Sequence, residues 1–273
     1  MANMEDARGR SKTKRLIEIP LRWRDRILGL IILFILLVVW EWQAQEGNVR
    51  ELYFPAPSII LQTFLELVES GELFANIAAT LRRLFIGFLL GGIPGYVMGI
   101  LMGWSPRLRS LVDPIFAALH PIPKIAIFPL FMIFMGIGEE SRIAVVAISA
   151  FFPLLINTME GVLHISPIHF SVAQNYGASP RKILQRIILP GSLPMVLAGV
   201  RIAGNTALTL TIAIEVVASR DGLGAMIWFS WQIIKIAELY STLVVITILG
   251  VTLNFLLGRI RPLLVPWYKK EKG

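Results

Sequence analysis

Residues 84–104 contain no Asp, Glu, Lys or Arg in 21 consecutive positions. A transmembrane helix needs about 20 predominantly apolar residues, so this segment is long enough to cross a bilayer. Five other segments have a similar character, although prolines and charges interrupt two of them, 115–137 and 193–217. The remaining three are 27–42, 143–159 and 239–257. The sequence therefore predicts an all-α membrane protein with six transmembrane helices.

The composition supports the same class. Only 16% of the 273 residues are charged, whereas a soluble domain carries about 25%. The absence of cysteine excludes disulfides, thiolate metal sites and cysteine nucleophiles. A net charge of +8 could indicate nucleic-acid binding, but basic residues in a membrane chain usually set its orientation. We therefore expect no nucleic-acid partner.

The distribution of basic residues predicts the topology. With both termini in the cytoplasm, the inner segments 1–26, 105–114, 160–192 and 258–273 hold 18 of the 26 Lys and Arg residues, and the outer segments hold six. This bias favours a multi-pass protein of the cell (inner) membrane with both termini cytoplasmic. No small-x-small cleavage site follows the first apolar run, so it is expected to remain as a signal-anchor helix.

These signals divide the chain into five parts. An amphipathic helix from Ser58 to Glu69, with Ser58 as its cap, is expected within the extracytoplasmic segment that follows the first transmembrane helix. The parts are a cytoplasmic N-terminus (1–26), a first transmembrane helix (27–44), an extracytoplasmic segment (45–83), a core transmembrane domain (84–257) with an inner loop at 160–192, and a cytoplasmic C-terminus (258–273). Glycines recur every fourth residue from 87 to 103, which predicts close packing of another helix on that face.

The inner loop has the sequence signals of two short helices. Ser166-Pro167 is typical of a helix start, and the helix is expected to run through Tyr176 and stop at Gly177. Ser179-Pro180 repeats the start signal. The second helix, 181–189, is expected to end before Pro190, with the next span beginning at Pro194. Such an element could transmit movement from a soluble partner into the membrane domain.

The loop also resembles a known family. Ala173-Gln174-Asn175-Tyr176-Gly177-Ala178-Ser179, Ile187-Ile188-Leu189-Pro190 and Leu197-Ala198-Gly199-Val200-Arg201 are similar to the "EAA" loop of binding-protein-dependent ABC importer permeases. Phe54-Pro55-Ala56-Pro57-Ser58, Asp113-Pro114, His120-Pro121-Ile122-Pro123, Phe134-Met135-Gly136-Ile137-Gly138-Glu139, Phe152-Pro153 and Asn157-Thr158 resemble the aliphatic-sulfonate, taurine and nitrate-type branch. Ser171 and Val172 depart from the Glu and Ala of the loop motif, and Lys124 stands where this branch often has a neutral residue.

The resemblance implies a MetI-like type I ABC importer permease fold and a set of partners. These are ABC ATPase subunits, an extracytoplasmic substrate-binding protein, and a second permease copy in a homodimer or a similar chain in a heterodimer. The chain itself would need no cofactor, because ATP and Mg²⁺ would act through the ATPase. The residues implied in coupling to the ATPase are Ala173, Tyr176, Gly177, Ala178, Ser179, Pro180 and Arg181.

The third span indicates where the substrate path lies. Its prolines break the helix, and freed backbone groups at membrane depth are tolerated only inside protein or along a cavity. The candidate path residues are His120, Pro121, Pro123, Asn157, Asn205 and Glu215. For Glu215 a structural hydrogen bond or pair is the favoured alternative, and Arg201 either attracts an anionic substrate or extends to the inner interface.

Other function classes find little support. The sequence has no G-x-x-x-x-G-K-[ST], G-x-S-x-G or H-E-x-x-H motif, so an enzyme is not expected and any ATP hydrolysis belongs to a partner. His164 and His169 lack further ligands for a metal. An ion-coupled secondary transporter remains as an alternative, with Glu215 as its deep acidic residue. For an importer, a sulfonate or taurine is favoured, while nitrate, bicarbonate and pyrimidine-type or riboflavin-type vitamin precursors remain open.

Overall fold

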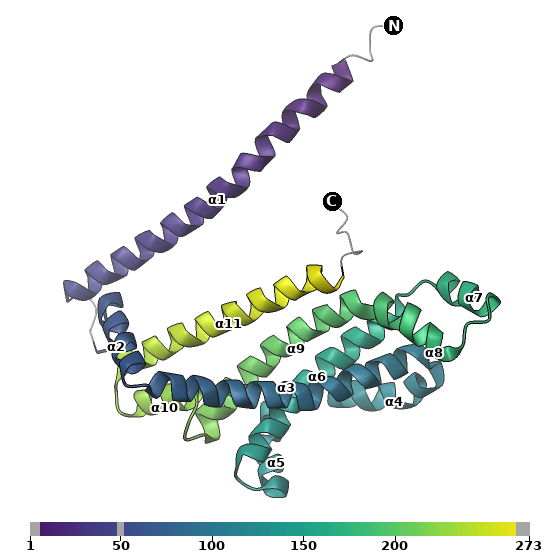
Figure 1. Cartoon of the computed structure of the whole chain (residues 1–273). Helices are drawn as coiled ribbons and strands as arrows, with labels where there is room; N and C mark the ends of the chain where they lie inside the picture. The colour runs from purple at the N-terminus through teal and green to yellow at the C-terminus, as the bar shows by residue number, and fades with distance from the viewer. Residues whose placement is uncertain (1–5, 48–51, 266–273) are drawn as a thin grey trace. The chain divides into compact units, whose positions relative to one another are not determined.

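The computed structural model describes residues 6–47 and 52–265, and these form helices and turns with no strand. The elements, coloured along the chain in Figure 1, are α1 (Asp6–Gln45), α2 (Pro57–Glu69), α3 (Glu72–Trp104), α4 (Pro106–Leu119), a 3₁₀ helix η1 (Lys124–Ile127), α5 (Phe128–Met135), α6 (Glu139–Leu163), α7 (Pro167–Asn175), α8 (Pro180–Ile183), a π-helix η2 (Leu184–Ile188), α9 (Leu189–Ala218), α10 (Leu223–Gln232) and α11 (Ile236–Leu264). The chain divides into two units, residues 1–65 and 66–273.

The first unit contains α1 and most of α2. Residues Ile27–Gln45 of α1 are long and apolar enough to cross a membrane. Glu41 lies near the end of this stretch, and its carboxylate accepts hydrogen bonds from the backbone N–H and the hydroxyl of Ser58, at 3.0 and 2.7 Å. The expected helix begins at Pro57. Ser58 therefore lies within the first turn of α2 and does not act as its cap.

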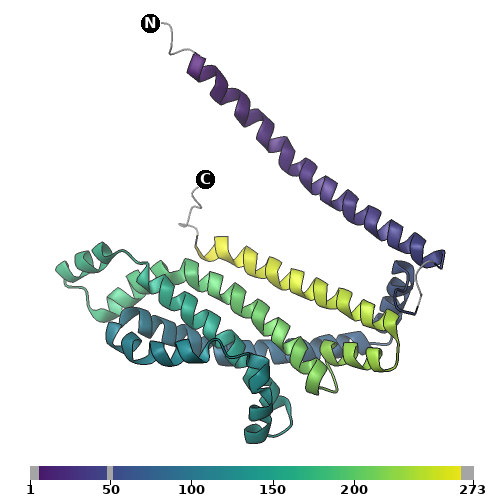
Figure 2. The same ribbon diagram turned by 180° about the vertical axis from the view of Figure 1, so that it is seen from behind.

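The second unit is built on three long helices that lie side by side. In both Figure 1 and Figure 2, α6 runs along α3 and α9, and α11 runs along α9. The α3–α6 contact follows the predicted glycine stripe. A Cβ at Gly95 would lie 2.5 Å from the carbonyl oxygen of Phe151, and one at Gly99 would lie 2.6 Å from that of Leu155. Small residues let the two backbones approach, as expected for membrane helices.

Five helices are long and apolar enough to span a membrane, and a bent pair makes a sixth candidate. The pair consists of α4 and the segment Lys124–Met135, which meet at 88°. Pro121 and Pro123 lie in the break, and Pro129 occupies the first turn of α5, where no N–H partner is needed. Five of the six predicted spans thus correspond to single long helices, and the bent pair occupies the position of the predicted third span.

One expected boundary was wrong, and one helix is longer than the apolar span expected within it. Helix α3 begins at Glu72, twelve residues before the span expected from Leu84, and it includes Arg82 and Arg83. The expected stop before Pro190 is absent, since the helical path is continuous from Pro180 to Ala218. Its η2 segment has the wider π-type hydrogen bonding, with the Leu189 N–H bonded to the carbonyl of Leu184. Such a widened turn accommodates the missing proline N–H.

Candidate functional site

The inner loop forms the predicted helix–glycine–helix segment. Helix α7 ends at Asn175, and Gly177 follows with φ of +67°, in the left-handed region that favours glycine. The Ala178 N–H bonds to the carbonyl of Ala173 and the Gly177 N–H to that of Gln174, both at 2.9 Å. This pair of bonds is a Schellman motif. The predicted role of Gly177 in ending the helix is confirmed.

The two helix starts are also confirmed, but not their caps. Pro167 and Pro180 are the first residues of α7 and α8. The hydroxyls of Ser166 and Ser179 make no capping hydrogen bond. The sequence therefore predicted the two starts correctly, but not the capping hydrogen bonds of Ser166 and Ser179.

Helix α7 has an inner face and an exposed apolar face. Phe170 and Ala173 pack on a buried cluster that includes Ile183 and Ile188 of the next helical segment. On the other side, Ile168, Val172 and Tyr176 are four residues apart and are 63%, 49% and 88% exposed. Residues four apart share one helix face. The remaining implied coupling residues, Ser179, Pro180 and Arg181, are exposed beside this face, and Ala178 is half-buried.

A cavity of about 500 Å³ lies between the broken third span and the long helices α6 and α9. Five apolar residues form much of its wall, and its polar lining comes from all three elements. The polar residues are His120, Lys124, Ser149, Asn205, Thr206 and Thr209; the others are Ile125, Phe152, Pro153, Leu210 and Ala213. Among the predicted path residues, His120 and Asn205 therefore share a cavity, whereas Pro121, Pro123 and Asn157 are not part of its wall.

Hydrogen bonds inside the helices hold several of these polar groups. The Thr209 hydroxyl donates to the carbonyl of Asn205, at 3.0 Å. The amides of Asn205 and Asn254 bond to each other, at 2.9 and 3.1 Å, which joins α9 to α11. Arg201 donates to the same Asn254 oxygen, at 3.1 Å. Asn157 is engaged with the carbonyl of Pro153 in its own helix, at 2.8 Å.

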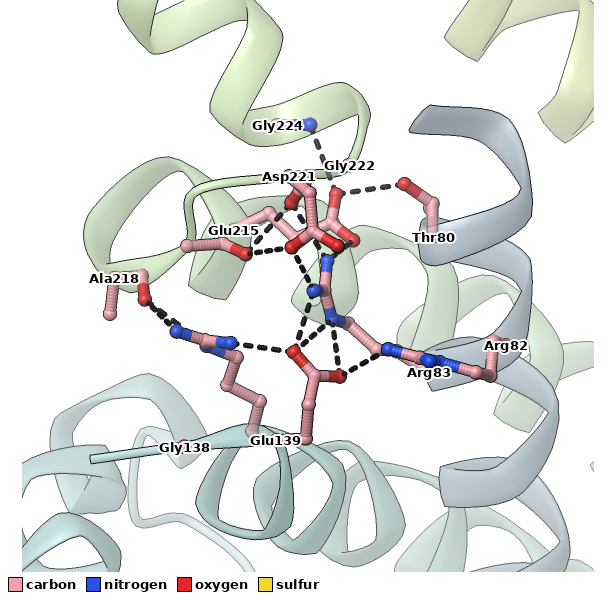
Figure 3. Close-up of polar contacts among 12 residues, drawn as sticks. Thr80, Arg82, Arg83, Gly138, Glu139, Glu215, Ala218, Asp221, Gly222 and Gly224 are labelled. Atoms are coloured by element: carbon pink, nitrogen blue, oxygen red, sulfur yellow. Dashed lines mark hydrogen bonds and ion pairs between the residues drawn. The ribbon is translucent and has the colours of Figure 1, made fainter. Parts of the chain in front are cut away.

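Glu215 lies elsewhere, in a buried ion-pair network centred on Arg83 (Figure 3). Both side chains are at most 1% exposed, and their charged groups meet at 2.8 Å. Arg83 also pairs with Glu139, at 2.7 Å, and with Asp221. One guanidinium thus joins α3, α6, α9 and the turn after α9. The predicted pairing role of Glu215 is the one that the geometry provides, and this side chain does not line the cavity.

Further polar contacts complete the network. Glu215 accepts hydrogen bonds from the Thr80 hydroxyl, at 2.9 Å, and from the Gly224 N–H, at 3.0 Å. Arg142 bridges Glu139, at 2.6 Å, and the carbonyl of Ala218, at 2.5 Å. Each nitrogen of the Arg83 guanidinium therefore donates to an acceptor, as the burial of a charged group requires.

Asp221 is the network's carboxylate in the turn between α9 and α10. Partial burial raises its pKa, but the hydrogen bond and the charge of Arg83 outweigh that effect and hold the pKa of Asp221 below its usual value. The stabilisation from this pair is therefore present above the ordinary pKa of aspartate, and it is lost as the pH falls through the lowered value.

Sequence reasoning missed this network. It assigned Arg82 and Arg83 to an outer segment on charge count alone. The available signal was an arginine pair directly before an uncharged stretch, together with an acidic residue in another span. Its partners Glu139 and Glu215 are 56 and 132 residues away in the chain, so no local pattern joins them.

Comparison with known proteins defines the family. Residues 95–270 match the model of the binding-protein-dependent transport system inner membrane component. The chain belongs to this family. The permease is 31% identical to the taurine transport system permease protein TauC of Escherichia coli (strain K12), over 90% of this chain and 93% of that protein. It is 30% identical to a Bacillus subtilis (strain 168) protein that bears the name of an aliphatic sulfonates transport permease, SsuC, over 90% and 89%.

The fold of the permease is similar to that of a solved structure. It matches a chain of the MetNI methionine ABC transporter, in a structure described as inward facing, with a TM-score of 0.63 and 20% identity. The match covers 72% of this chain and 97% of the other. The expected MetI-like fold is thus confirmed, and the chain is an ABC importer permease, a transport subunit with several apolar helices.

Proposed function

We propose that this permease forms the membrane path of an ATP-driven importer for a small sulfonate, of the taurine or short aliphatic class. The relatives named for taurine and for aliphatic sulfonates support this substrate class. Coupling to ATP hydrolysis is supported by one observation, the exposed helix–glycine–helix segment of α7 and α8. Its apolar outer face has no partner within the described chain. Such a face is typical of a protein-binding surface.

The coupling surface comprises the outer face of α7 and the following turn. It would sit in a groove of a separate ABC ATPase, with the apolar side chains of Val172 and Tyr176 at its centre and Arg181 at its edge. ATP and Mg²⁺ bind to the ATPase, and this chain needs no cofactor. When the ATPase subunits close, they move the surface. Because the path from α8 to Ala218 is one continuous helix, the displacement passes directly into the α9 wall of the cavity.

The assembly follows from the same proposal. Two permease copies enclose one path, which is the homodimer expected for this family, and each copy engages one ATPase. An extracytoplasmic binding protein delivers the substrate. Both chain termini lie in the cytoplasm, on the side of α7 and α8, as the distribution of basic residues favours. His120 and Asn205 line the path, and the prolines at 121 and 123 maintain the break that opens it.

Reconstitution tests this function. The full chain is placed in proteoliposomes with the ATPase and binding protein encoded beside it, and uptake of radiolabelled taurine and ethanesulfonate is measured with and without ATP. Uptake that requires ATP, the ATPase and the binding protein is the expected result. Uptake by the permease alone, driven by an ion gradient and indifferent to ATP, would contradict it. ATP-driven uptake of nitrate, bicarbonate or a pyrimidine, without uptake of sulfonates, would support an ATP-driven importer but contradict the proposed sulfonate substrate.

The coupling surface gives a separate prediction. Tyr176→Asp places a charge on a side chain that is 88% exposed, so folding is expected to be unaffected. Desolvating that charge against the ATPase is expected to weaken binding about tenfold or more. Pull-down and titration of purified ATPase against the permease in nanodiscs measure the effect.

Gln174→Asp is the matched control for this variant. It adds the same charge at an exposed polar position of α7, and we expect it to reduce ATPase binding less than threefold, within the range of a peripheral contact. Equal thermal stability of both variants shows that neither unfolds the loop. Unchanged affinity of Tyr176→Asp would mean that the ATPase binds elsewhere.

A further inference from the structure

Lys124 is a cation at the centre of the membrane domain. It begins η1, directly after the break in the third span, and it lines the cavity opposite α6 and α9. The neighbouring wall residues Ser149 and Phe152 lie near the middle of α6, and Asn205 lies near the middle of α9. A charge at this depth is unfavourable in a bilayer unless protein or water surrounds it. Its presence there therefore indicates a role in the path.

The contacts of Lys124 leave most of its charge uncompensated. Its ammonium donates to the carbonyl of His120 and lies 5.2 Å from the centre of the Phe152 ring. Both contacts stabilise a cation without neutralising it. Over the part of the chain that the structure describes, no carboxylate forms an ion pair with Lys124, and no acidic residue lines the cavity.

Arg83 shows what a satisfied cation looks like in the same molecule. It meets three carboxylates, at Glu139, Glu215 and Asp221, and is buried. Lys124 is half-buried and faces a cavity. The protein thus surrounds one buried cation with carboxylates and leaves the other available to a ligand.

Three lining side chains retain hydrogen-bond donors. The Lys124 ammonium has three N–H groups and uses one on His120. The imidazole of His120 carries at least one ring N–H in any protonation state found in proteins. The Asn205 amide has two N–H groups and uses one on Asn254. By contrast, the hydroxyls of Ser149, Thr206 and Thr209 donate to backbone carbonyls of their own helices. The free donors of the cavity therefore come from Lys124, His120 and Asn205.

We propose that Lys124, His120 and Asn205 form a binding site for the sulfonate group of the substrate inside the permease. This inference rests on the proposed function and adds a site to it. A tetrahedral oxyanion presents three oxygens, and the three side chains supply one charged and two neutral donors. The short organic tail lies against the apolar wall of Ile125, Leu210 and Ala213. A volume of about 500 Å³ falls within the usual range for small-molecule sites.

The site explains how a permease can discriminate after its binding protein has released the substrate. An anion that enters the cavity replaces lost water with the Lys124 charge, whereas a cation meets the same charge without compensation. Asn205 lies on α9, and α9 is continuous with α8. Movement of the coupling surface therefore changes the distance from Asn205 to Lys124 and His120. Binding is then tight in one state and weak in the other, as transport requires.

The test uses the complete importer in proteoliposomes and two readouts, taurine or ethanesulfonate uptake and ATP hydrolysis stimulated by loaded binding protein. In Lys124→Met, uptake is expected to fall about tenfold, as for one lost charge contact. ATP hydrolysis should stay within about twofold, since the coupling surface is unchanged, and the ratio of uptake to ATP therefore falls. A merely structural lysine would lower both readouts together. Lys124→Arg keeps the charge and is expected to retain uptake within about threefold.

Two further variants keep the proposal falsifiable. Lys235→Met removes an exposed lysine that pairs with Glu238 outside the cavity, and it should transport normally. Asn205→Asp keeps Lys124 but adds a carboxylate to the same wall, so uptake should fall as in Lys124→Met; this variant decides the outcome if Lys124→Met does not fold. Wild-type uptake in both Lys124→Met and Asn205→Asp would overturn the site. If the wild-type importer itself moves no sulfonate with ATP, the proposed function fails instead.

Discussion

Arg83→Met is expected to destabilise the permease by about 3–5 kcal/mol, the range measured when one partner of a buried ion pair is removed. The reason is Glu215, whose side chain is fully buried. Without the guanidinium, this carboxylate keeps hydrogen bonds from Thr80 and Gly224 but has no counter-charge. Because Arg83 also holds Glu139 and Asp221, the ends of α3, α6 and α9 are expected to separate.

The neighbouring arginine provides the matched control. Arg82 pairs with Glu139 at 3.2 Å, but its side chain is 56% exposed. Exposed pairs contribute about 0–1 kcal/mol, so Arg82→Met is expected to have little effect. Free energies of unfolding are measured for both variants by denaturant titration of the full chain in detergent, with activity after refolding as a check on reversibility.

A double variant separates lost charge from lost packing. Arg83→Met with Glu215→Gln removes both the cation and the buried carboxylate, and the neutral amide can still accept from Thr80 and Gly224. We expect it to recover at least half of the stability lost in Arg83→Met. If the double variant is as unstable as the single one, the unpaired charge is not the cause. Equal stability of Arg83→Met and the wild type would contradict the central role of this network.

The coupling segment could be predicted closely because its signals are local. Proline at a helix start and glycine at a helix end act within four residues, and Pro167, Gly177 and Pro180 are placed as their sequence indicates. The close packing of a helix on the glycine face of α3 could also be predicted, since the spacing of the glycines alone defines one helix face. Family resemblance added the partner that such a segment binds, which no spacing rule provides.

The other features could not be predicted, because they depend on residues far apart in the chain or on opposing local preferences. Glu215 had two open roles, and the choice between them required Arg83, which is 132 residues away. Pro190 is a helix breaker by residue type, yet the π-type segment before it carries the helix onward. The break in the third span was expected from its prolines, but its 88° bend and the cavity that it opens depend on how α6 and α9 pack around it.

Gly91→Ala is expected to destabilise the membrane domain by about 3 kcal/mol, the upper part of the range for overpacked cores. An added Cβ would overlap the carbonyl oxygen of Ala147 in α6. Backbone atoms cannot rotate away as a flexible side chain would, so α3 and α6 must move apart. That separation also weakens the contacts at Gly87, Gly95 and Gly99, which share the same face.

Gly258→Ala is the same chemical change in a helix where no atom lies within 4 Å of the added Cβ. Alanine is the better helix former by about 1 kcal/mol, so this variant is expected to be neutral or slightly more stable. The two substitutions therefore separate steric overlap from helix propensity, and only Gly91→Ala should lower the free energy of unfolding. Equal effects would show that α3 and α6 do not pack through the glycine face. A stable Gly91→Ala with reduced transport would instead mean that the two helices must slide on that face during the transport cycle.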